Sequence, residues 1–343
     1  MASPNIPAQS RLSEEQLLLE VQRRAVRFFW EKADPGTGLI NDRANNFGDE
    51  NSVVASGAAT GYGLAALPIG VENGWLNRIE ASNRARRTLR FLLNMPNVRG
   101  WILHYVDKRN GERVWESEYS SIDTALLIAG AIVCGQYFAR DAATLDISVL
   151  SEALYRRIDW QWMLTNNYTQ PNKKVLSHGW KPETGFITYN YDSYSEAILL
   201  YLLGLGAPVN PLPGTTWESI ARPLQTYYGI ESLKAGPIFI HQMPSGFFCF
   251  GNQRDKLGFD YWASSRNAMK IHRQFCIDRS GDAQTYARDV IGIDLGMALL
   301  AIENYRSGTV WRLMNSFYPI LPAFRAAGFR STSEPEPRPV HTH

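Results

Sequence analysis

The stretch SIDTALLIAGAIVCG, residues 121–135, decides the fold of this 343-residue chain. After Asp123 it carries no charge, and nearly all its residues are small or aliphatic. A helix that is apolar on every side must be buried on every side. Small residues also allow a neighbouring backbone to come close. The stretch therefore predicts a helix at the centre of the molecule.

Other segments divide into two kinds of helix. Three share the apolar composition and are also expected to be buried: VVASGAATGYGLAALPIG (53–70), SYSEAILLYLLGLG (193–206) and GIDLGMALLAIENY (292–305). Others carry apolar residues at helical spacing along one face: 13–30, 78–94, 146–164, 214–228 and 309–327. The first of these begins with a capping-box pattern, Ser13 followed by Gln16. Segment 256–278 is a further, more polar helix.

The alternation of exposed and buried helices predicts the architecture. Short gaps between helices favour antiparallel hairpins. We expect an all-α fold, an α/α toroid in which an inner ring of apolar helices is wrapped by an outer amphipathic ring, with short β-hairpins in its loops. A two-domain helical protein is the alternative, but no internal linker divides the chain. The toroid domain would span 13–329, between a flexible N-terminus (1–12) and a disordered tail (330–343).

Two strand-like pieces, 101–107 and 113–117, predict one of the β-hairpins. Glu183-Thr184-Gly185 predicts the turn of another.

Composition excludes several function classes. Lys+Arg number 35 and Asp+Glu 33, a near balance that argues against a nucleic-acid partner. Three cysteines without paired spacing do not describe a disulfide framework. No CxxC or HExxH pattern suggests a metal, and we expect no cofactor. We also expect no membrane span, because no uncharged apolar run reaches about 18 residues. Oligomeric state is left open.

The first residues lack the apolar core of a signal peptide. The protein as written would be cytoplasmic. It would be periplasmic or secreted if a leader had been removed.

Acidic residues stand at the starts of the buried helices. Asp123 opens one, Asp192 and Glu196 flank the start of the next, and Asp294 opens another. In a toroid of hairpins the inner helices run the same way, so these acids would ring one cavity. Helix N-termini favour negative charge. The alternative is simple capping, since Asp is a preferred N-cap residue.

Many aromatic side chains lie near these acids, and their flat faces can pack on the C–H faces of sugar rings. The alternative is that they fill the core, which we expect of about half of them. Candidates are His104, Trp115, Tyr119, His178, Trp180 and Tyr194.

A series of motifs then resembles the glucoamylase-like domain family, which includes the glycoside hydrolase family 144 endo-β-1,2-glucanases. The motifs follow in order from about Arg24 to Phe329: RAVRFFWEKADPGTGLINDRA, SGAATGYGLAALPIG, SEYSSIDTALLIAGAI, HGWKPETGF, YDSYSEAILLYLLGLG, GPIFIHQ, RQFCID and VIGIDLGMALLAIENYRSG. The resemblance implies an (α/α)6 toroid and inverting endo-hydrolysis of β-1,2-glucan without a metal. The implied partner is therefore an oligo- or polysaccharide substrate.

The resemblance also implies residue roles. It places functional carboxylates at Glu118, Asp123, Asp192 and Glu196. We expect Glu196 to be the general acid and either Asp123 or Glu118 to be the base or a proton relay. An inverting pair stands roughly 6.5–9.5 Å apart, so that water fits between. The expected sugar-binding residues are His104, Trp115, Tyr119, His178, Trp180, Asp192, Tyr194, His241 and Gln242.

The chain departs from the family pattern in two places. After GPIFIHQ, Phe247, Cys249 and Gly251 stand where the pattern has Trp, Asp and Arg. After RQFCID, the chain reaches Arg288–Val290 without a loop and a helical hairpin that the family carries. By comparison with the family, the expected fold is therefore an (α/α)6 toroid-like barrel that is incomplete, with about five helical hairpins.

We therefore keep a second reading, an inactive or weakly active glycan-binding remnant of the family. A helical cyclase or scaffold is a third and less favoured reading, since we find none of the metal-binding clusters that such cyclases need.

Overall fold

The computed structural model describes residues 12–47, 52–164, 174–280 and 289–332. Most of the predicted flexible N-terminus (1–12) and of the predicted tail (330–343) lies outside these ranges. Two residues of that predicted tail are ordered within a strand. They form β11 (Arg330–Ser331), which pairs with β9 (Gln253–Arg254).

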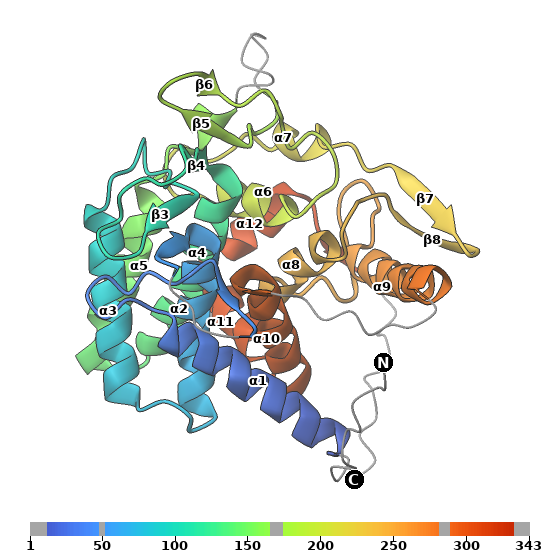
Figure 1. Ribbon diagram of the computed structural model, residues 1–343. Helices are drawn as coiled ribbons and strands as arrows, with labels where there is room; N and C mark the ends of the chain where they lie inside the picture. Colours follow the sequence, from blue (N-terminus) through green and yellow to red (C-terminus); the bar gives the residue numbers. More distant parts are fainter. Residues whose placement is uncertain (1–11, 48–51, 165–173, 281–288, 333–343) are drawn as a thin grey trace.

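Five helices form the inner ring (Figure 1). Each contacts the next, and the fifth contacts the first, so within the described residues the ring closes on five members. They are α2 (Gly57–Glu72), α4 (Ser121–Phe138), α6 (Ile198–Leu205), α8 (Phe239–Phe247) and α10 (Gly292–Arg306).

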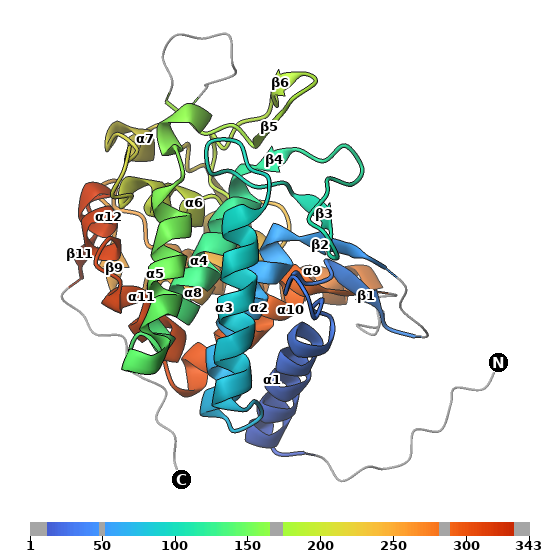
Figure 2. The same ribbon diagram turned by 90° about the vertical axis from the view of Figure 1, so that its left-hand side faces the viewer.

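An outer layer of helices covers this ring (Figures 1 and 2). Helix α1 (Glu14–Glu31) packs on α2 and α10, while α3 (Arg78–Asn94) and α5 (Leu145–Arg156) lie side by side over α4. Helix α9 (Tyr261–Ser280) packs on α8, and α12 (Ile320–Ala326) packs on α6. The predicted all-α, toroid-like fold is confirmed.

One helix lies across the end of the ring where the inner helices finish. Helix α11 (Thr309–Ser316) contacts α4, α8 and α10. Its last residue, Ser316, donates a hydrogen bond of 3.1 Å to Gln136, near the C-terminal end of α4. The opposite end of the ring, where the inner helices begin, is therefore the end at which a site can open.

Short strands occupy the loops at that opening. Strand β1 (Arg43–Asn45) pairs with β10 (Asp289–Ile291), and β2 (Val54–Ser56) pairs with β3 (Tyr105–Asp107). A three-stranded sheet joins β4 (Tyr119–Ser120), β5 (Gly179–Lys181) and β6 (Gly185–Phe186). Strands β2, β4 and β10 each run directly into an inner helix.

Several predicted elements match the structure. The capping box at Ser13 and Gln16 is present at the start of α1. The turn at Glu183-Thr184-Gly185 joins β5 to β6. The predicted pairing of 101–107 with 113–117 is reduced to single bridges such as Val106 with Arg113, because segment 105–107 pairs instead with β2.

The predicted helix over 214–228 is wrong. Only α7 (Thr215–Glu218) is helical there, and the chain then enters a hairpin of β7 (Leu224–Tyr227) and β8 (Ile230–Leu233). Pro223 interrupts a continuing helix because it lacks an N–H group. Tyr228 and Gly229 at the hairpin turn both have positive φ, at 53° and 72°, which helical residues do not adopt.

Other helix boundaries also differ from the prediction. Helix α6 begins only at Ile198, so residues 193–197 approach the ring as a loop. The segment predicted as one helix over 309–327 divides into α11 and α12 at Pro319. Segment 146–164 ends as α5 at Arg156, followed by a short 3-10 helix at Trp160–Met163.

Helices α2 and α4 make the closest approach in the ring. A Cβ added at Gly130 would lie 1.8 Å from the carbonyl oxygen of Gly61, and one added at Gly61 would lie 2.4 Å from the carbonyl oxygen of Leu126. Real Cβ atoms do not come so close to backbone. The glycines are therefore required by the backbone-to-backbone contact of two buried helices.

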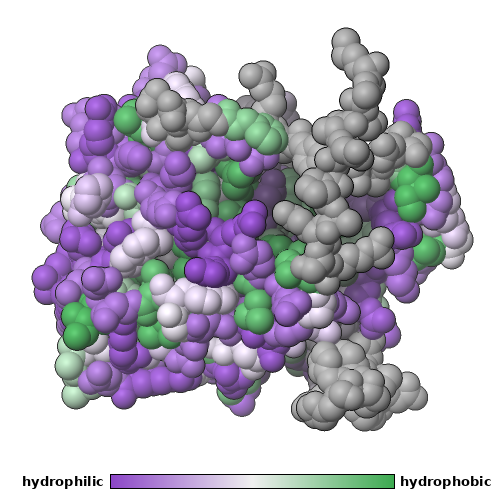
Figure 3. Space-filling model, turned by 60° about the horizontal axis from the view of Figure 1, so that its bottom comes forward, coloured by the Kyte–Doolittle hydropathy of each residue, from purple (hydrophilic) through white to green (hydrophobic). Residues whose placement is uncertain are grey.

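Helix α4 is long and apolar enough to cross a membrane by length and composition, but 89% of it is buried inside the ring. The face of the molecule in Figure 3 is largely hydrophilic, and its hydrophobic areas are small and separated. The apolar side chains of α4 thus lie inside the molecule, and the face in Figure 3 exposes mainly hydrophilic residues.

The α2–α4 contact makes a testable prediction. Gly130→Ala should lower the free energy of unfolding by about 3 kcal/mol or more, because overpacking against rigid backbone forces the helices apart. Urea unfolding would measure the loss. Gly236→Ala is the matched control, since an added Cβ there meets no atom within 4 Å. Equal midpoints for the two variants would contradict the proposed close packing.

Candidate active site

Backbone hydrogen bonds tie together the starts of three inner helices. The N–H of Gly57, at the start of α2, donates to the carbonyl of His104 at 3.3 Å. The N–H of Ser121, at the start of α4, donates to the carbonyl of His178 at 3.0 Å. The N–H of Gly292, at the start of α10, donates to the carbonyl of Asp42 at 2.8 Å. The loops carrying these residues therefore form one mouth.

A histidine lies between two carboxylates at this mouth. His104 Nδ1 is 2.9 Å from Glu118 Oε1, and His104 Nε2 is 3.6 Å from Asp123 Oδ2. Asp123 Oδ2 also accepts a hydrogen bond of 2.6 Å from Ser120, the N-cap residue of α4. The side chain of Ser120, rather than that of Asp123, caps α4. The Asp123 carboxylate is therefore available to His104.

The environments of the two carboxylates shift their pKa values in opposite directions. Burial raises the pKa of Asp123, whose side chain is only 7% exposed. Burial would also raise the pKa of Glu118, but the hydrogen bond and charge of His104 outweigh it and lower that pKa. Burial would lower the pKa of His104, but Asp123 and Glu118 together raise it. An imidazolium next to an ionised Glu118 is the favoured state of this pair.

Glu196 lies in the loop before α6 and faces the same cluster. Burial raises its pKa, and the charge of Asp123 raises it further. The charges of Glu196, Asp123 and Glu118 all act on Tyr191, which is buried. The carboxylates of Glu196, Asp123 and Glu118 are thus gathered at one end of the ring, as the directions of the inner helices predict.

Aromatic rings extend outward from the cluster. Tyr105 stacks on His104 with ring centroids 3.7 Å apart, and Trp115 packs edge-on against Tyr105 at 5.2 Å. Trp115 is 71% exposed, and Trp115 and Glu116 both have positive φ, at 55° and 49°. Such strained backbone often marks functional sites. It presents the Trp115 ring to solvent at the edge of the mouth.

A second group of rings lies on the three-stranded sheet. Tyr119 packs against Trp180 with centroids 5.9 Å apart, and His178 stacks on Tyr191 at 3.9 Å. Burial lowers the pKa of His178, so its imidazole is neutral near pH 7.

The loop bearing Trp115 is fixed to this sheet through Arg113. Its guanidinium donates to the carbonyls of Glu116 and Ser117 and pairs with Glu183 in the β5–β6 turn. The two groups of rings are therefore held in a fixed relation.

The remaining predicted residues occupy different positions. His241 on α8 is 2% exposed, its Nδ1 lies 3.2 Å from the Tyr194 hydroxyl, and burial lowers its pKa to about 4. Its Nε2 is buried with no partner among the described residues. Gln242 is half-buried beside it. Asp192 is exposed, and its backbone carbonyl accepts from the N–H of Ala221 at 2.7 Å.

One acid at the mouth escaped the sequence reasoning. Asp42 is buried, accepts a hydrogen bond of 2.9 Å from Arg43, and its charge acts on His104, Asp123 and Asp294. No helix begins at Asp42, so a search for acids at helix starts could not find it. Asp42 lies between Asn41, which bridges to Ala55, and Arg43, the first residue of β1, and the sequence around it gives no other signal of a site.

Comparison with known proteins agrees with the predicted family. The Glycoamylase family model matches residues 188–290 and 279–317. An exo β-1,2-glucooligosaccharide sophorohydrolase (non-reducing end) from Parabacteroides distasonis is 25% identical over 323 residues, covering 82% of this chain. The chain spans only 43% of the length of that relative.

Solved structures share the fold. A glucoamylase-like protein from Bacteroides fragilis NCTC 9343 has a TM-score of 0.85 at 20% identity, covering 96% of this chain and 100% of its own. An endo-β-1,2-glucanase from Chitinophaga pinensis, solved with sophorotriose and glucose, has a TM-score of 0.83 at 18% identity, covering 94% and 99%. The chain is a helical toroid of the glucoamylase type. The resemblance to the glucoamylase-like family that includes the endo-β-1,2-glucanases is confirmed.

The His104 cluster makes a prediction that does not depend on activity. Glu118→Gln should lower the pKa of His104, because the substitution removes a carboxylate that stabilises the imidazolium. An NMR titration of the His104 ring signals would measure it. Glu183→Gln, which removes a carboxylate paired with Arg113, should leave that titration unchanged. An unchanged His104 titration in Glu118→Gln would contradict the ion pair between His104 and Glu118.

Proposed function

We propose that this protein hydrolyses β-1,2-linked glucan with inversion, as an endo-acting glycoside hydrolase. The observation that carries the proposal is the pair Glu196 and Glu118 at one mouth, with pKa values shifted in opposite directions. Carboxyl groups whose environments separate their pKa values can divide the acid and base roles between them. Inverting glycosidases need this division.

Glu196 is the general acid of the proposal. Its raised pKa favours the protonated carboxyl group over the ionised one more than in an ordinary Glu, and the proton passes to the glycosidic oxygen as the C–O bond breaks. The loop position of Glu196, before α6 begins, leaves its carboxyl outside the helix and directed to the cluster.

Glu118 is the better candidate for the base. Its side chain is 22% exposed, against 7% for Asp123, so a water and a sugar can reach it. Its lowered pKa keeps it ionised, and it takes a proton from the water that attacks the anomeric carbon. Attack from the face opposite the leaving group inverts the configuration.

Asp123 and His104 then act as positioning residues. Protonated His104 donates from Nδ1 to Glu118 and presents its second N–H to Asp123. The imidazolium fixes the orientation of the Glu118 carboxylate through one N–H and faces Asp123 with the other. Because both ring nitrogens carry protons, His104 takes no proton from Glu118, and the proton gained from water leaves Glu118 to solvent after product release.

The two groups of aromatic rings supply the proposed sugar-binding surfaces near the acids. Tyr105 and Trp115 form one group, and Tyr119, His178 and Trp180 form the other. Tyr194, His241, Gln242 and Asp192 complete the proposed sugar-binding set. The buried, unpartnered Nε2 of His241 suits a hydrogen bond with a sugar hydroxyl.

The names of relatives support the β-1,2 linkage of the proposal. The names of both the Parabacteroides relative and the Chitinophaga structure specify β-1,2-linked glucose. They differ in exo and endo action. Exo action, with release of the disaccharide from one end, is the second candidate because the Parabacteroides relative has the higher identity. Product sizes from a long chain separate the two: a mixture of lengths means endo action, and one disaccharide means exo action.

Substitution of the acid tests the mechanism. Glu196→Gln should lower kcat on β-1,2-glucan by about 10²-fold or more, as expected for the loss of a general acid. Glu118→Gln should cause a similar loss. Reducing-end assays would measure both, and proton NMR of the first products would report inversion. Glu152→Gln, on the outer helix α5, is the control. Retained activity in Glu196→Gln would remove that residue from the mechanism.

The pH dependence gives an independent test. Activity needs Glu118 ionised and Glu196 protonated, so the profile of kcat/KM should be bell-shaped. The acidic limb should lie below the ordinary Glu pKa and the alkaline limb above it. His104→Gln should move the acidic limb to higher pH, because it removes the charge that lowers the pKa of Glu118. An acidic limb that does not move would contradict the positioning role.

The glycan-binding remnant is favoured by one observation. The family model matches in two pieces that overlap at residues 279–290, the point where the sequence predicts a missing hairpin. Most of that junction lies outside the described residues. Calorimetry with β-1,2-linked oligosaccharides distinguishes the cases, since a remnant would bind without turnover.

A further inference from the structure

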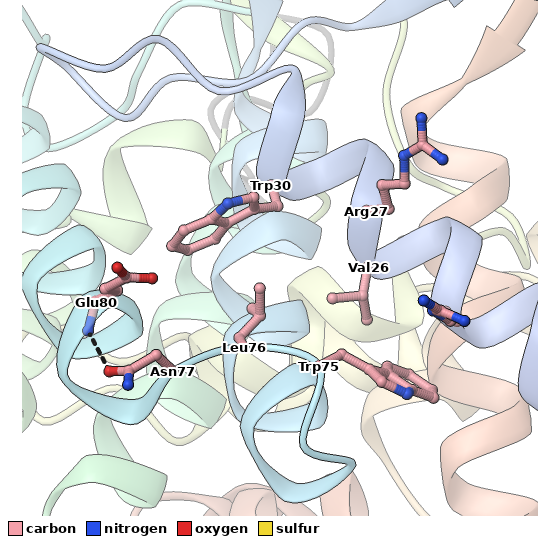
Figure 4. Close-up of a pocket in the computed structure, with 8 residues that line it drawn as sticks. Val26, Arg27, Trp30, Trp75, Leu76, Asn77 and Glu80 are labelled. Atoms are coloured by element: carbon pink, nitrogen blue, oxygen red, sulfur yellow. Dashed lines mark hydrogen bonds between the residues drawn. The ribbon is translucent and has the colours of Figure 1, made fainter.

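A second cavity lies on the outer wall of the toroid, between α1 and the start of α3 (Figure 4). It has a volume of about 260 Å³ and opens to solvent. Helix α1 contributes two turns, the loop after α2 contributes the lower edge, and α3 contributes its first turn. The lining residues are Arg23, Val26, Arg27, Trp30, Trp75, Leu76, Asn77 and Glu80.

The cavity is remote from the acid cluster. Helix α2 begins at Gly57, where an added Cβ would lie 3.3 Å from Asp123 Cβ, and it ends at Glu72, just before Trp75. Sixteen helical residues extend about 24 Å at 1.5 Å per residue. The two regions are therefore at opposite ends of α2.

The lower edge of the cavity is preformed. Gly74 has a φ of 71°, and the N–H groups of Trp75 and Leu76 both donate to the carbonyl of Gly70, at 2.8 and 3.0 Å. Asn77 then caps α3, accepting from the N–H groups of Ile79 and Glu80. Binding sites for small molecules are usually preformed in this way.

Four polar groups of the cavity are available to a ligand. Among the described residues, the indole N–H groups of Trp30 and Trp75 donate to no protein atom, and Arg23 and Glu80 form no ion pair. The Arg84 guanidinium lies 4.1 Å from the centre of the Trp30 ring and holds that ring in place. Two fixed indoles thus border a space with unused donors and acceptors.

The chemistry of this lining selects a neutral, hydroxyl-rich ligand. Arg27 is paired with Glu31, and the remaining charges of Arg23 and Glu80 balance, so the lining favours neither an anion nor a cation. A sugar ring offers C–H faces to the indoles, and its hydroxyls can accept from indole or guanidinium N–H and donate to a carboxylate. Tryptophan provides an apolar face and one polar N–H for such a ligand.

We propose that this Trp30–Trp75 cavity is a second saccharide-binding site, which holds another stretch of the same β-linked glucan chain. The choice of β-1,2-glucan as its ligand rests on the proposed function. A polymer held at two points about 24 Å apart dissociates more slowly than one held at a single point. The site would therefore keep long chains on the enzyme.

NMR of the indole N–H groups tests the proposal directly. The full-length Glu196→Gln protein is titrated with a β-1,2-linked glucose tetrasaccharide, and the signals of Trp30 and Trp75 are assigned with Trp30→Phe and Trp75→Phe. Both signals should shift as the saccharide is added. If they stay fixed, whether or not signals at the mouth move, the second site is overturned.

Binding to long chains gives the second measurement. In the Glu196→Gln background, Trp75→Ala and Glu80→Gln should each weaken binding to long β-1,2-glucan by about tenfold. Ile79→Ala is the matched control, since Ile79 is 71% exposed on the same helix turn but does not line the cavity. Affinities equal to the control would overturn the proposal. If the wild-type protein hydrolyses no β-1,2-glucan but the Trp30 and Trp75 signals still shift, the second binding site stands and only the hydrolase proposal fails.

Discussion

The contact between Gly61 and Gly130 is the constraint on which the structure depends. It brings the backbones of α2 and α4 together where no Cβ would fit. Because both helices run the same way from this contact, their first turns lie side by side at the mouth. Gly57 then lies close to Asp123, where an added Cβ would come within 3.3 Å of the Asp123 Cβ and within 2.6 Å of Ile102 Cδ1. The acid cluster is thus positioned by backbone packing far more than by interactions among the acids.

This packing has an electrostatic cost that His104 offsets. Burial raises the pKa of Asp123, so in this environment the ionised form is disfavoured relative to the unfolded chain. A carboxyl with a raised pKa contributes stability that is lost as the pH rises from its pKa in the unfolded chain through its pKa in the folded protein. Glu118 behaves in the opposite sense, because its lowered pKa contributes stability that is lost as the pH falls through the folded value. His104 couples the two, because the charge of its imidazolium acts to lower the pKa of both carboxyl groups.

Much of the ring could be predicted because its signal is local. A helix with no polar face, such as 121–135, can only be central, and small residues within it predict close neighbours. The acids at helix starts followed from the common direction of inner helices. Asp42 could not be found by that rule, because it lies in the bend before β1, and the partner of β1, β10, lies far along the chain. The strands over 224–233 could not be predicted for a different reason. The spacing of the apolar residues in this segment fits a helix as well as a strand. Pro223 decides in favour of the strand, because it interrupts a helix.

One departure from the family pattern near α8 can be explained by the closure of the ring. Within the described residues α8 contacts α10 directly, and α10 contacts α2. Phe247 is consequently buried, with its ring 5.6 Å from that of Tyr62 on α2, and Tyr62 fills the space that Gly296 of α10 leaves open. Of the three altered positions, only Phe247 lies where these helices meet. Cys249 and Gly251 follow the end of α8 and are half-buried. The exchange of the family's Trp for Phe247 therefore fits the close contact of α8, α10 and α2, while the other two exchanges lie outside that contact.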